Sequence, residues 1–333
     1  MTGALPPLMR ALELREGQPA PVLVERPLPV PRRGEVLVRI AAAPINPNDL
    51  MFLRDEYEIR KPRPTVPGFE GAGTVVASGG GFVARMMLGR RVACAAGDGD
   101  GTWAEYAVVP ALRCVPLRRD VELEQGATLL TNPLTAWVLA ARARRERHRG
   151  VVLTAAAGAL GRMLERLLRR QGLAVVSIVR RPAQVEALRA DGAEHVLDSS
   201  ADGFAGELRD RAARLGATLL LDAVGGETTG RVLAAMPQGS VARVYGMLSN
   251  APCELDPAEL VFRGKRVEGF TMYDWLRTTS MLGQLLAVSK VQRRVRDVLA
   301  TRVQARLPLA DHAQALAKAV GSANDGKVLF VPA

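Results

Sequence analysis

The sequence is poor in cysteine, histidine, lysine and aromatic residues, and it has no long apolar run. Its three cysteines, Cys94, Cys114 and Cys253, are widely spaced and odd in number, so they imply no disulfide framework. They also do not form the cluster of Cys and His ligands that structural zinc needs. The longest uncharged run, 125–141, is shorter than the roughly 20 apolar residues of a membrane helix. No signal-peptide pattern opens the chain. We therefore expect a cytoplasmic protein with no membrane partner and no metal.

Positive charge is abundant although lysine is scarce. The formal net charge is +11, from 45 Lys and Arg against 34 Asp and Glu. The only lysines are Lys61, Lys265, Lys290, Lys318 and Lys327. The arginines are spread along the chain with few aromatic residues among them, so a stacking platform for nucleic acid is not evident. A solvated basic surface is the simpler interpretation. An RNA-binding protein without catalysis is kept as the alternative of another class.

The hydrophobic pattern changes near residue 120, which together with the length of 333 residues predicts two domains. Before that point, short apolar runs between Pro and Gly turns predict strands at 22–25, 35–40, 73–77 and 91–95. After it, a long helix over 123–149 is expected, and strands then alternate with helices. The expected strands are 151–154, 174–179, 196–197, 218–222, 241–245 and 266–270; the helices are 161–171, one opened by Pro182 and closed by Gly192, 203–215 and 227–235. Such alternation predicts an α/β fold, a doubly wound parallel sheet of the Rossmann type.

The turn after the first of these strands has the composition of a dinucleotide-binding site. It reads Ala-Ala-Ala-Gly-Ala-Leu-Gly over 155–161 and leads directly into a helix. Backbone N–H groups and the positive end of the helix dipole favour phosphate at such a place. Gly158 lets the backbone approach the ligand, and Gly161 lets the helix pack close to the strand. An ordinary tight turn is the alternative, but its place in a series of alternating units favours a nucleotide. The predicted cofactor residues are Ala157, Gly158, Ala159, Leu160 and Gly161.

The end of the second strand indicates which nucleotide binds. An Asp or Glu about twenty residues after the turn is typical of NADH sites, because it accepts a hydrogen bond from the ribose hydroxyl. Here Arg180 and Arg181 follow the strand. Guanidinium groups bind a phosphate in bidentate fashion, whereas a carboxylate would repel it. The charge therefore predicts NADPH.

Several motifs, in this order, carry a resemblance to a known family. They are Ile45–Asp49, Pro67–Gly73, Gly101–Tyr106, Thr131–Trp137, the cofactor turn and Gly326–Val328. With these motifs the chain resembles the medium-chain dehydrogenase/reductase superfamily over nearly its whole length. The resemblance implies a Rossmann NADPH-binding domain (120–274) inserted into a β-rich GroES-like catalytic domain (1–119 plus 275–333). It also implies a homodimer, formed through edge strands such as 266–270.

The catalytic zinc ligands of the superfamily's alcohol dehydrogenases are missing. The positions matching their Cys, His and Cys are Asn46, Phe69 and Thr131. Asn and Thr are poor zinc ligands, and Phe cannot ligate. Without that Lewis acid, the simplest route to alcohol oxidation is lost. The chain therefore resembles the zinc-free branch, which contains NADPH-dependent quinone oxidoreductases and mitochondrial-type 2-enoyl thioester reductases.

The motifs divide between these two groups. Asn132-Pro133-x-Thr135-Ala136, Val224–Gly226, Tyr245-Gly246 and Gly269-Phe270 are similar to the enoyl thioester reductases, whereas 157–161 is similar to the quinone reductases. The substrate, an enoyl thioester or a quinone, is therefore open. The resemblance adds these cofactor-site candidates: Asn132, Thr135, Tyr245, Gly246, Phe270, Met272 and Lys327.

Reduction of a polarised C=C bond needs a proton as well as the hydride of NADPH. A tyrosine, with an ordinary pKa of about 10, holds its proton at neutral pH. Tyr57 matches the position of the proposed proton donor of the enoyl thioester reductases, and its neighbours Asp55 and Glu56 would raise its pKa further if they lie close to the hydroxyl. Asn46 is the second predicted catalytic residue, beside the nicotinamide. A quinone would need no such donor, because a reduced quinone takes protons from water.

Overall fold

The computed structural model describes residues 5–321 and 326–332. Its contacts divide the chain into two units, and the first is discontinuous in sequence. This first unit contains the residues up to Pro133 and those from Gln292 onward, and the second unit is Leu134–Val291. The segment 275–291, expected with the catalytic domain, belongs to the second unit. No helix among the described residues is both long and apolar enough to cross a membrane.

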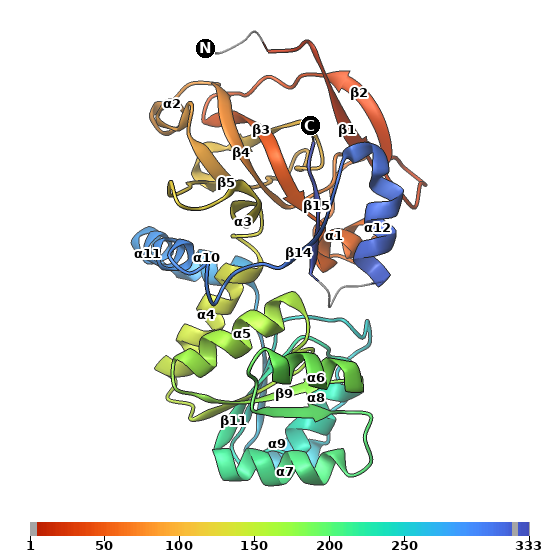
Figure 1. The fold of residues 1–333 in the computed structure, drawn as a ribbon, viewed down its shortest axis with the longest axis vertical. Helices are drawn as coiled ribbons and strands as arrows, with labels where there is room; N and C mark the ends of the chain where they lie inside the picture. The colour runs from red at the N-terminus through yellow and green to blue at the C-terminus, as the bar shows by residue number, and fades with distance from the viewer. Residues whose placement is uncertain (1–4, 322–325, 333) are drawn as a thin grey trace. The chain divides into compact units, whose positions relative to one another are not determined.

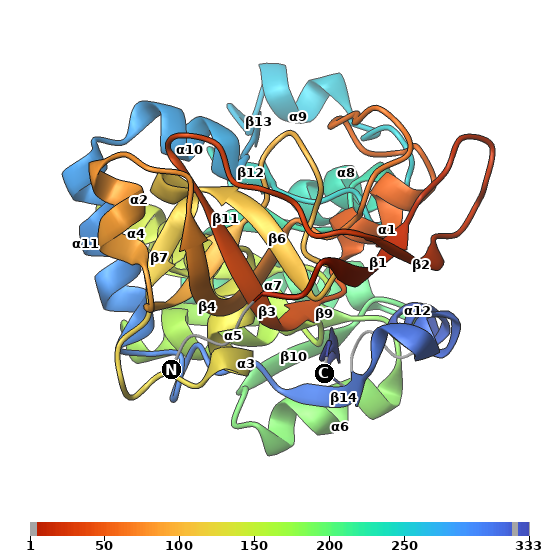
Figure 2. The same ribbon diagram turned by 90° about the horizontal axis from the view of Figure 1, so that it is seen from above.

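The first unit is built mainly on antiparallel strands, with one parallel pair formed by its last two strands (Figures 1 and 2). A two-stranded sheet pairs β1 (Leu8–Glu13) with β2 (Val22–Pro27). The larger sheet has the order β14-β15-β3-β4-β5-β7, and β6 pairs with β3. Its strands are β3 (Glu35–Pro44), β4 (Glu70–Ser78), β5 (Arg91–Ala95), β6 (Tyr106–Pro110), β7 (Cys114–Pro116), β14 (Val303–Leu307) and β15 (Lys327–Phe330).

The C-terminal strand β15 completes the core of this unit. It pairs antiparallel with β3, so that Phe330 lies opposite Ala43. The Phe330 ring packs edge-on against the buried Trp103, with ring centroids 5.1 Å apart. The Ile45 N–H also donates to the Val328 carbonyl at 3.0 Å. This pairing brings the start of β15 beside the segment that leads from β3 into the first helix.

Short helices complete the first unit. They are α1 (Pro47–Leu53), α2 (Phe82–Met87), α3 (Leu123–Ala127) and α12 (His312–Gly321). The expected long helix over 123–149 is wrong, because the chain leaves helical geometry between α3 and α4 (Asn132–Arg145). Pro133 explains the break. It has no N–H for the preceding turn and is tolerated only at a helix start, and it is the second residue of α4.

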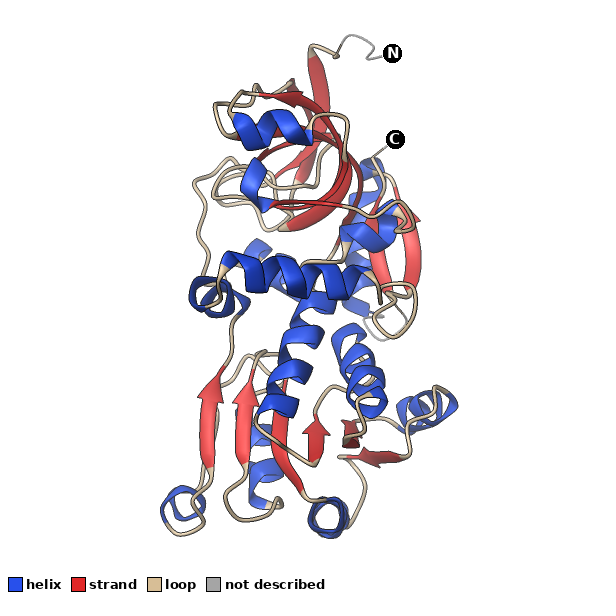
Figure 3. Ribbon diagram, turned by 90° about the vertical axis from the view of Figure 1, so that its left-hand side faces the viewer, coloured by secondary structure: helices blue, strands red, loops and turns tan. Residues whose placement is uncertain are grey.

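The second unit is a parallel sheet with helices, as the alternating pattern predicted (Figure 3). All its neighbouring strands run parallel in the order β10-β9-β8-β11-β12-β13. The strands are β8 (Gly150–Leu153), β9 (Ala174–Val179), β10 (His195–Asp198), β11 (Ala217–Asp222), β12 (Val241–Val244) and β13 (Arg266–Gly269); the helices are α4, α5 (Ala159–Arg170), α6 (Pro182–Ala190), α7 (Phe204–Leu215), α8 (Gly226–Ala234), α9 (Pro257–Val261), α10 (Met272–Thr278) and α11 (Met281–Gln292). The order reverses between β8 and β11, and doubly wound sheets bind dinucleotides at that point, outside the carboxyl ends of their strands.

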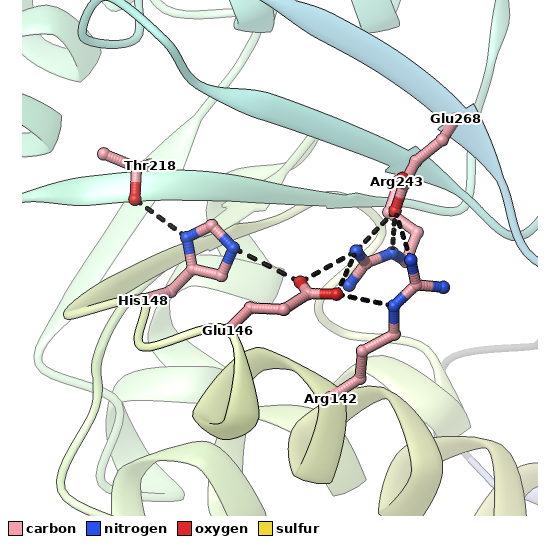
Figure 4. A network of polar contacts seen from close by, with 6 residues as sticks. All are labelled: Arg142, Glu146, His148, Thr218, Arg243 and Glu268. Carbon is pink, nitrogen blue, oxygen red and sulfur yellow. Dashed lines mark hydrogen bonds and ion pairs between the residues drawn. The ribbon is translucent and has the colours of Figure 1, made fainter.

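A charge network around one buried arginine ties the edge of this sheet to α4 (Figure 4). Arg243 on β12 is 1% exposed and pairs with Glu146, 2.9 Å away, and with Glu268 on β13. Arg142 of α4 also donates to both carboxylates. Two carboxylates shared by two guanidinium groups offset the cost of burying Arg243. The network therefore fixes the edge strand β13 against the helix.

Candidate active site

Asn46 lies at the centre of a buried polar cluster in the first unit. It immediately precedes α1 and is 1% exposed. Its side-chain Nδ2 donates to Glu70 Oε1 at 2.9 Å, and its Oδ1 accepts from Lys327 Nζ. Its backbone N–H donates to Asp49 Oδ2 at 2.7 Å, three residues on, as in a helix N-terminal capping box. The cluster therefore joins the starts of α1, β4 and β15.

The electrostatics of the cluster are dominated by burial. Burial raises the pKa of Asp49 to about 7, although hydrogen bonds from the Asn46 and Phe69 backbone N–H groups oppose the rise. Burial likewise raises the pKa of Glu70 above its ordinary value. For Lys327, burial lowers the pKa to about 8, while Glu70 and Asp49 act in the opposite direction. One ammonium and two carboxylates can be buried together here because each of them has hydrogen-bond partners in the cluster.

The residues at the superfamily's zinc position do not fit a zinc ion. Phe69 replaces a ligand with an aromatic ring, which packs edge-on against Phe52 and Tyr57 at centroid distances of 5.5 and 5.4 Å. Lys61 Nζ lies 5.3 Å from the same ring. Asn46 is engaged by Glu70 and Lys327, and a lysine ammonium beside its oxygen would repel a cation. Across residues 5–321 and 326–332, His, Cys, Asp and Glu form no group of three or more that could hold a metal.

Tyr57 lies in the segment after α1, with its ring against Phe69. Partial burial raises the pKa of its hydroxyl; a hydrogen bond with Asn48 opposes the rise, and the charges of Asp49 and Glu58 add to it. The expected sources, Asp55 and Glu56, are not those that act. Asp55 forms ion pairs with Arg63 and Arg60 instead, at 2.6 and 3.3 Å. The hydroxyl is thus protonated at neutral pH; burial is the main cause of its raised pKa, and Glu58 is the neighbouring charge that adds to it.

The cofactor turn has the geometry that its glycines predict. The chain leaves β8 at Leu153, and α5 begins at Ala159 after Gly158, which has the extended conformation of a helix N-cap. A Cβ on Gly161 would lie 2.6 Å from the Ala155 carbonyl oxygen, so only glycine permits this close packing. The first turn of a helix leaves its backbone N–H groups without intrahelical acceptors. Those of Ala159, Leu160 and Gly161 are therefore suited to an anion.

The other predicted cofactor residues of the second unit follow the carboxyl ends of its strands. Arg180 and Arg181 come directly after β9, and both side chains are exposed. Tyr245 and Gly246 come after β12; the Tyr245 N–H donates to the Asp222 carbonyl at 2.8 Å, and a Cβ on Gly246 would lie 2.7 Å from the Ala223 oxygen. Phe270 follows β13, and Met272 begins α10. Parallel strands bring these residues to one edge of the sheet.

Asn132 and Thr135 are the remaining predicted cofactor contacts. Both lie in the first two turns of α4 and are buried. Asn132 is the residue before Pro133, where the first segment of the first unit ends, and Thr135 lies in the second unit. Their contact with a cofactor stays a prediction.

Thr154 and Asp222 form a buried contact beside the predicted cofactor site that the sequence did not reveal. Asp222, at the end of β11, accepts hydrogen bonds from Thr154 Oγ1 at 2.5 Å, Thr229 Oγ1 at 2.6 Å and the Val224 N–H at 2.9 Å. Thr154 follows β8, so this carboxylate links the two strand ends at the topological switch point. In the sequence, Asp222 can be recognised as an aspartate that ends an apolar strand just before a Gly-Gly pair. Its hydrogen-bond partner Thr154 cannot be recognised, because it lies 68 residues away.

Comparison with known proteins agrees with this geometry. Residues 32–119 match the alcohol dehydrogenase GroES-like domain, and residues 159–287 match the zinc-binding dehydrogenase family. A candidate NADPH:quinone reductase from Mesorhizobium loti has a crystal structure that is 31% identical, with a TM-score of 0.89, 99% of this chain covered and 100% of that chain. The chain belongs to the zinc-free branch of the medium-chain dehydrogenase/reductase superfamily. It is an oxidoreductase of the medium-chain type.

Curated relatives of this chain are named enoyl-[acyl-carrier-protein] reductase rather than quinone reductase. The mitochondrial enoyl-[acyl-carrier-protein] reductase of Caenorhabditis elegans is 29% identical over 327 residues, which cover 95% of this chain and 93% of the relative. The bovine enzyme of the same name is 28% identical, with 83% and 76% covered. A mycobacterial protein whose structure was solved with NADPH is 27% identical, with a TM-score of 0.81, 97% of this chain covered and 100% of that chain.

Proposed function

We propose that this medium-chain reductase uses NADPH to reduce the activated C=C bond of a 2-enoyl thioester or a related enone. The observation that carries the proposal is Tyr57, a partly buried hydroxyl with a raised pKa, packed on the Phe69 ring that replaces a metal ligand. The relatives named enoyl-[acyl-carrier-protein] reductase support this substrate class.

The residues of the second unit fit NADPH. The 157–161 turn and the α5 N-terminus would hold the pyrophosphate, and Arg180 and Arg181 would bind the 2′-phosphate. Tyr245, Gly246, Phe270 and Met272 would line the groove outside the strand ends. When bound, NADPH supplies a hydride to the β-carbon of the substrate.

Tyr57 would supply the other component of the reduction, a proton for the α-carbon, from its hydroxyl oxygen. Asn46 would stand beside the nicotinamide as the second catalytic residue. Neither role requires a metal, because the proton donor is an ordinary hydroxyl group held in its protonated form.

An NADPH:quinone oxidoreductase is the second candidate. The 157–161 turn is similar to that of the quinone reductases, and the Mesorhizobium loti relative bears that name. Since the oxygens of a reduced quinone take protons from water, this activity would not depend on Tyr57.

Replacement of Tyr57 by Phe separates the two activities. We expect Tyr57→Phe to lower kcat for a short-chain 2-enoyl thioester by about 100-fold or more, the contribution typical of a positioned general acid, and to leave quinone reduction unchanged. Tyr106→Phe, which removes the hydroxyl of another partly buried tyrosine, is the control and should retain both activities. NADPH oxidation measured with each substrate gives the answer. Enoyl reduction at the wild-type rate in Tyr57→Phe would exclude this donor.

The same substrates give a pH test. Because the pKa of Tyr57 is raised above about 10, deprotonation of the donor should cost no activity below that value, and a loss of enoyl reduction near pH 8 would follow Lys327, whose pKa is about 8; that loss should be absent in Lys327→Met.

We also propose that the protein forms a homodimer through β13. This strand is the last in its sheet, so within the described chain its outer edge pairs with no strand. Unpaired edges favour pairing with another strand. Val261 and Phe262, just before β13, are 70% and 79% exposed. A second copy pairing antiparallel with this edge would complete the ladder and cover part of this apolar surface.

A further inference from the structure

The amide of Asn46 has only one orientation that its neighbours allow. A side-chain amide can usually turn over, exchanging its oxygen and nitrogen, at little cost. Here one side faces the Lys327 ammonium, which can only donate, and the other faces the Glu70 carboxylate, which in its ionised form can only accept. Turning the amide over would set donor against donor and acceptor against acceptor in a buried site, where unsatisfied polar groups are costly.

The two charged groups are themselves held in place. The second oxygen of Glu70 accepts from the backbone N–H groups of Leu130 and Thr131, at 3.1 and 3.0 Å. Lys327 Nζ also donates to the Ile45 carbonyl. Glu70 begins β4 and Lys327 begins β15, and all three side chains are buried. The orientation of the amide is therefore set by the strands of the sheet.

We propose that Lys327 and Glu70 are positioning residues that act through Asn46, by fixing which face of its amide is nitrogen and which is oxygen in the reductive site. The inference rests on the proposed function for the role of Asn46. The Asn46 side chain also accepts from the Asp49 backbone N–H in the capping box. After these bonds the amide keeps one N–H, and the orientation decides where it points. In this role Lys327 acts on the reaction through Asn46 and needs no contact with the cofactor.

The test compares two buried lysines. We expect Lys327→Met to lower kcat by at least about 10-fold, the order of loss for a misplaced catalytic group. NADPH affinity should stay unchanged, and NADPH deuterated at the transferred position should give a larger kinetic isotope effect, because the hydride step is slowed. Lys265→Met is the control: this lysine is also buried and bonds backbone carbonyls, Leu233 among them, but lies in the second unit. It should retain kcat. A folded Lys327→Met with wild-type kcat and isotope effect would overturn the proposal.

A double variant distinguishes orientation from stability. In Glu70→Gln, the oxygen of the new amide would accept from the Leu130 and Thr131 N–H groups. Its nitrogen would then face Asn46 Nδ2, so that two donors meet. Asn46 could not turn over to remove this clash, because its oxygen accepts from Lys327. Adding Lys327→Met should therefore restore part of the melting temperature lost in Glu70→Gln, because a turned Asn46 then loses only the bond from the Asp49 N–H and gains one with the new amide. We expect kcat to stay low in the double variant. Recovery of kcat together with stability would overturn the proposal.

The wild-type protein allows a test that needs no variant to fold. In NMR spectra of protein labelled with 15N and 13C asparagine, one Nδ2–H of Asn46 should be shifted downfield by the carboxylate and exchange slowly with water. Two equivalent, rapidly exchanging protons would contradict the fixed orientation. This measurement holds whatever the substrate, so a wild-type protein that reduces no enoyl substrate would refute the proposed function and leave the orientation to be decided separately.

Discussion

Arg180 and Arg181 are two exposed cations at the carboxyl end of β9, and the preference for NADPH depends on them. We expect Arg180→Ala and Arg181→Ala each to weaken NADPH binding by about 10- to 100-fold, since a hydrogen bond to a charged group contributes about 1.5–3 kcal/mol. NADH affinity should hardly change, because NADH has no 2′-phosphate. Binding can be followed by the fluorescence of the reduced nicotinamide.

Arg189→Ala is the matched control for these variants. Arg189 is an exposed arginine in the last turn of the neighbouring helix α6. It should leave both affinities unchanged. Equal losses of NADH and NADPH affinity in the Arg180 and Arg181 variants would show that these arginines do not read the 2′-phosphate.

For single residues, the sequence shows which side chain stands at each position but not which other side chain it bonds. The replacement of zinc ligands by Asn46 and Phe69 could be read from the chain directly. The bond between Asn46 and Lys327 could not, because these residues are 281 positions apart and meet only when β15 pairs beside β3. The charges on Tyr57 come from near neighbours, Glu58 and Asp49, but the chain does not show that Asp55 turns to Arg60 and Arg63 instead.

At the scale of an element, the strand–turn–helix unit of β8 and α5 depends on Gly161. A Cβ there would lie 2.6 Å from the Ala155 oxygen and 2.7 Å from the Ala156 Cα, both backbone atoms. Overpacking of this kind costs about 1–3 kcal/mol, so we expect Gly161→Ala to lower the free energy of unfolding by that amount. It should also weaken NADPH binding, because α5 must move away from the turn.

Gly206→Ala offers the opposite expectation. Gly206 lies inside α7, and a Cβ there would meet nothing within 4 Å. Alanine in a helix interior is favoured over glycine by about 0.5–1 kcal/mol, so this variant should be more stable than the wild type. Denaturation curves of both variants check the pair; a Gly161→Ala protein as stable as Gly206→Ala would show that the turn tolerates a side chain.

Strands β2 to β5 and most elements of the second unit were predicted, whereas β1, β6 and β7 were not, and one predicted helix is interrupted for a physical reason. Strands such as β5 and β9 coincide with the predicted ranges because apolar runs between glycines have few alternatives. The helix expected over 123–149 is interrupted between α3 and α4, although its apolar residues continue through the break. The hydrophobic pattern gives no information about backbone donors, and Pro133 has no backbone N–H to continue the helix.

At the scale of the whole molecule, the proposed dimer depends on the outer edge of β13. The Arg266 and Phe270 N–H groups donate inward to β12, to Ser240 and Val244. The alternating N–H of Val267 therefore points to the open edge. We expect Val267→Pro, which removes that donor, to dissociate the dimer, whereas Val267→Thr, which keeps it, should not. Sedimentation equilibrium over a range of concentrations measures both. A wild-type protein that is monomeric throughout would refute this interface.

Local residue types were enough to predict the α/β layers of the second unit and the lack of a zinc site. Apolar strands that alternate with helices indicate a parallel sheet, glycines at 158 and 161 indicate a close turn, and Asn46, Phe69 and Thr131 are not a set of zinc ligands. Which charged groups meet depends instead on the fold. Pairing of β15 with β3 placed Lys327 on Asn46, and the order of strands joined Thr154 to Asp222 across the switch point. The physical reason is that apolar patterning is read from near neighbours, whereas hydrogen bonds between distant residues depend on strand register.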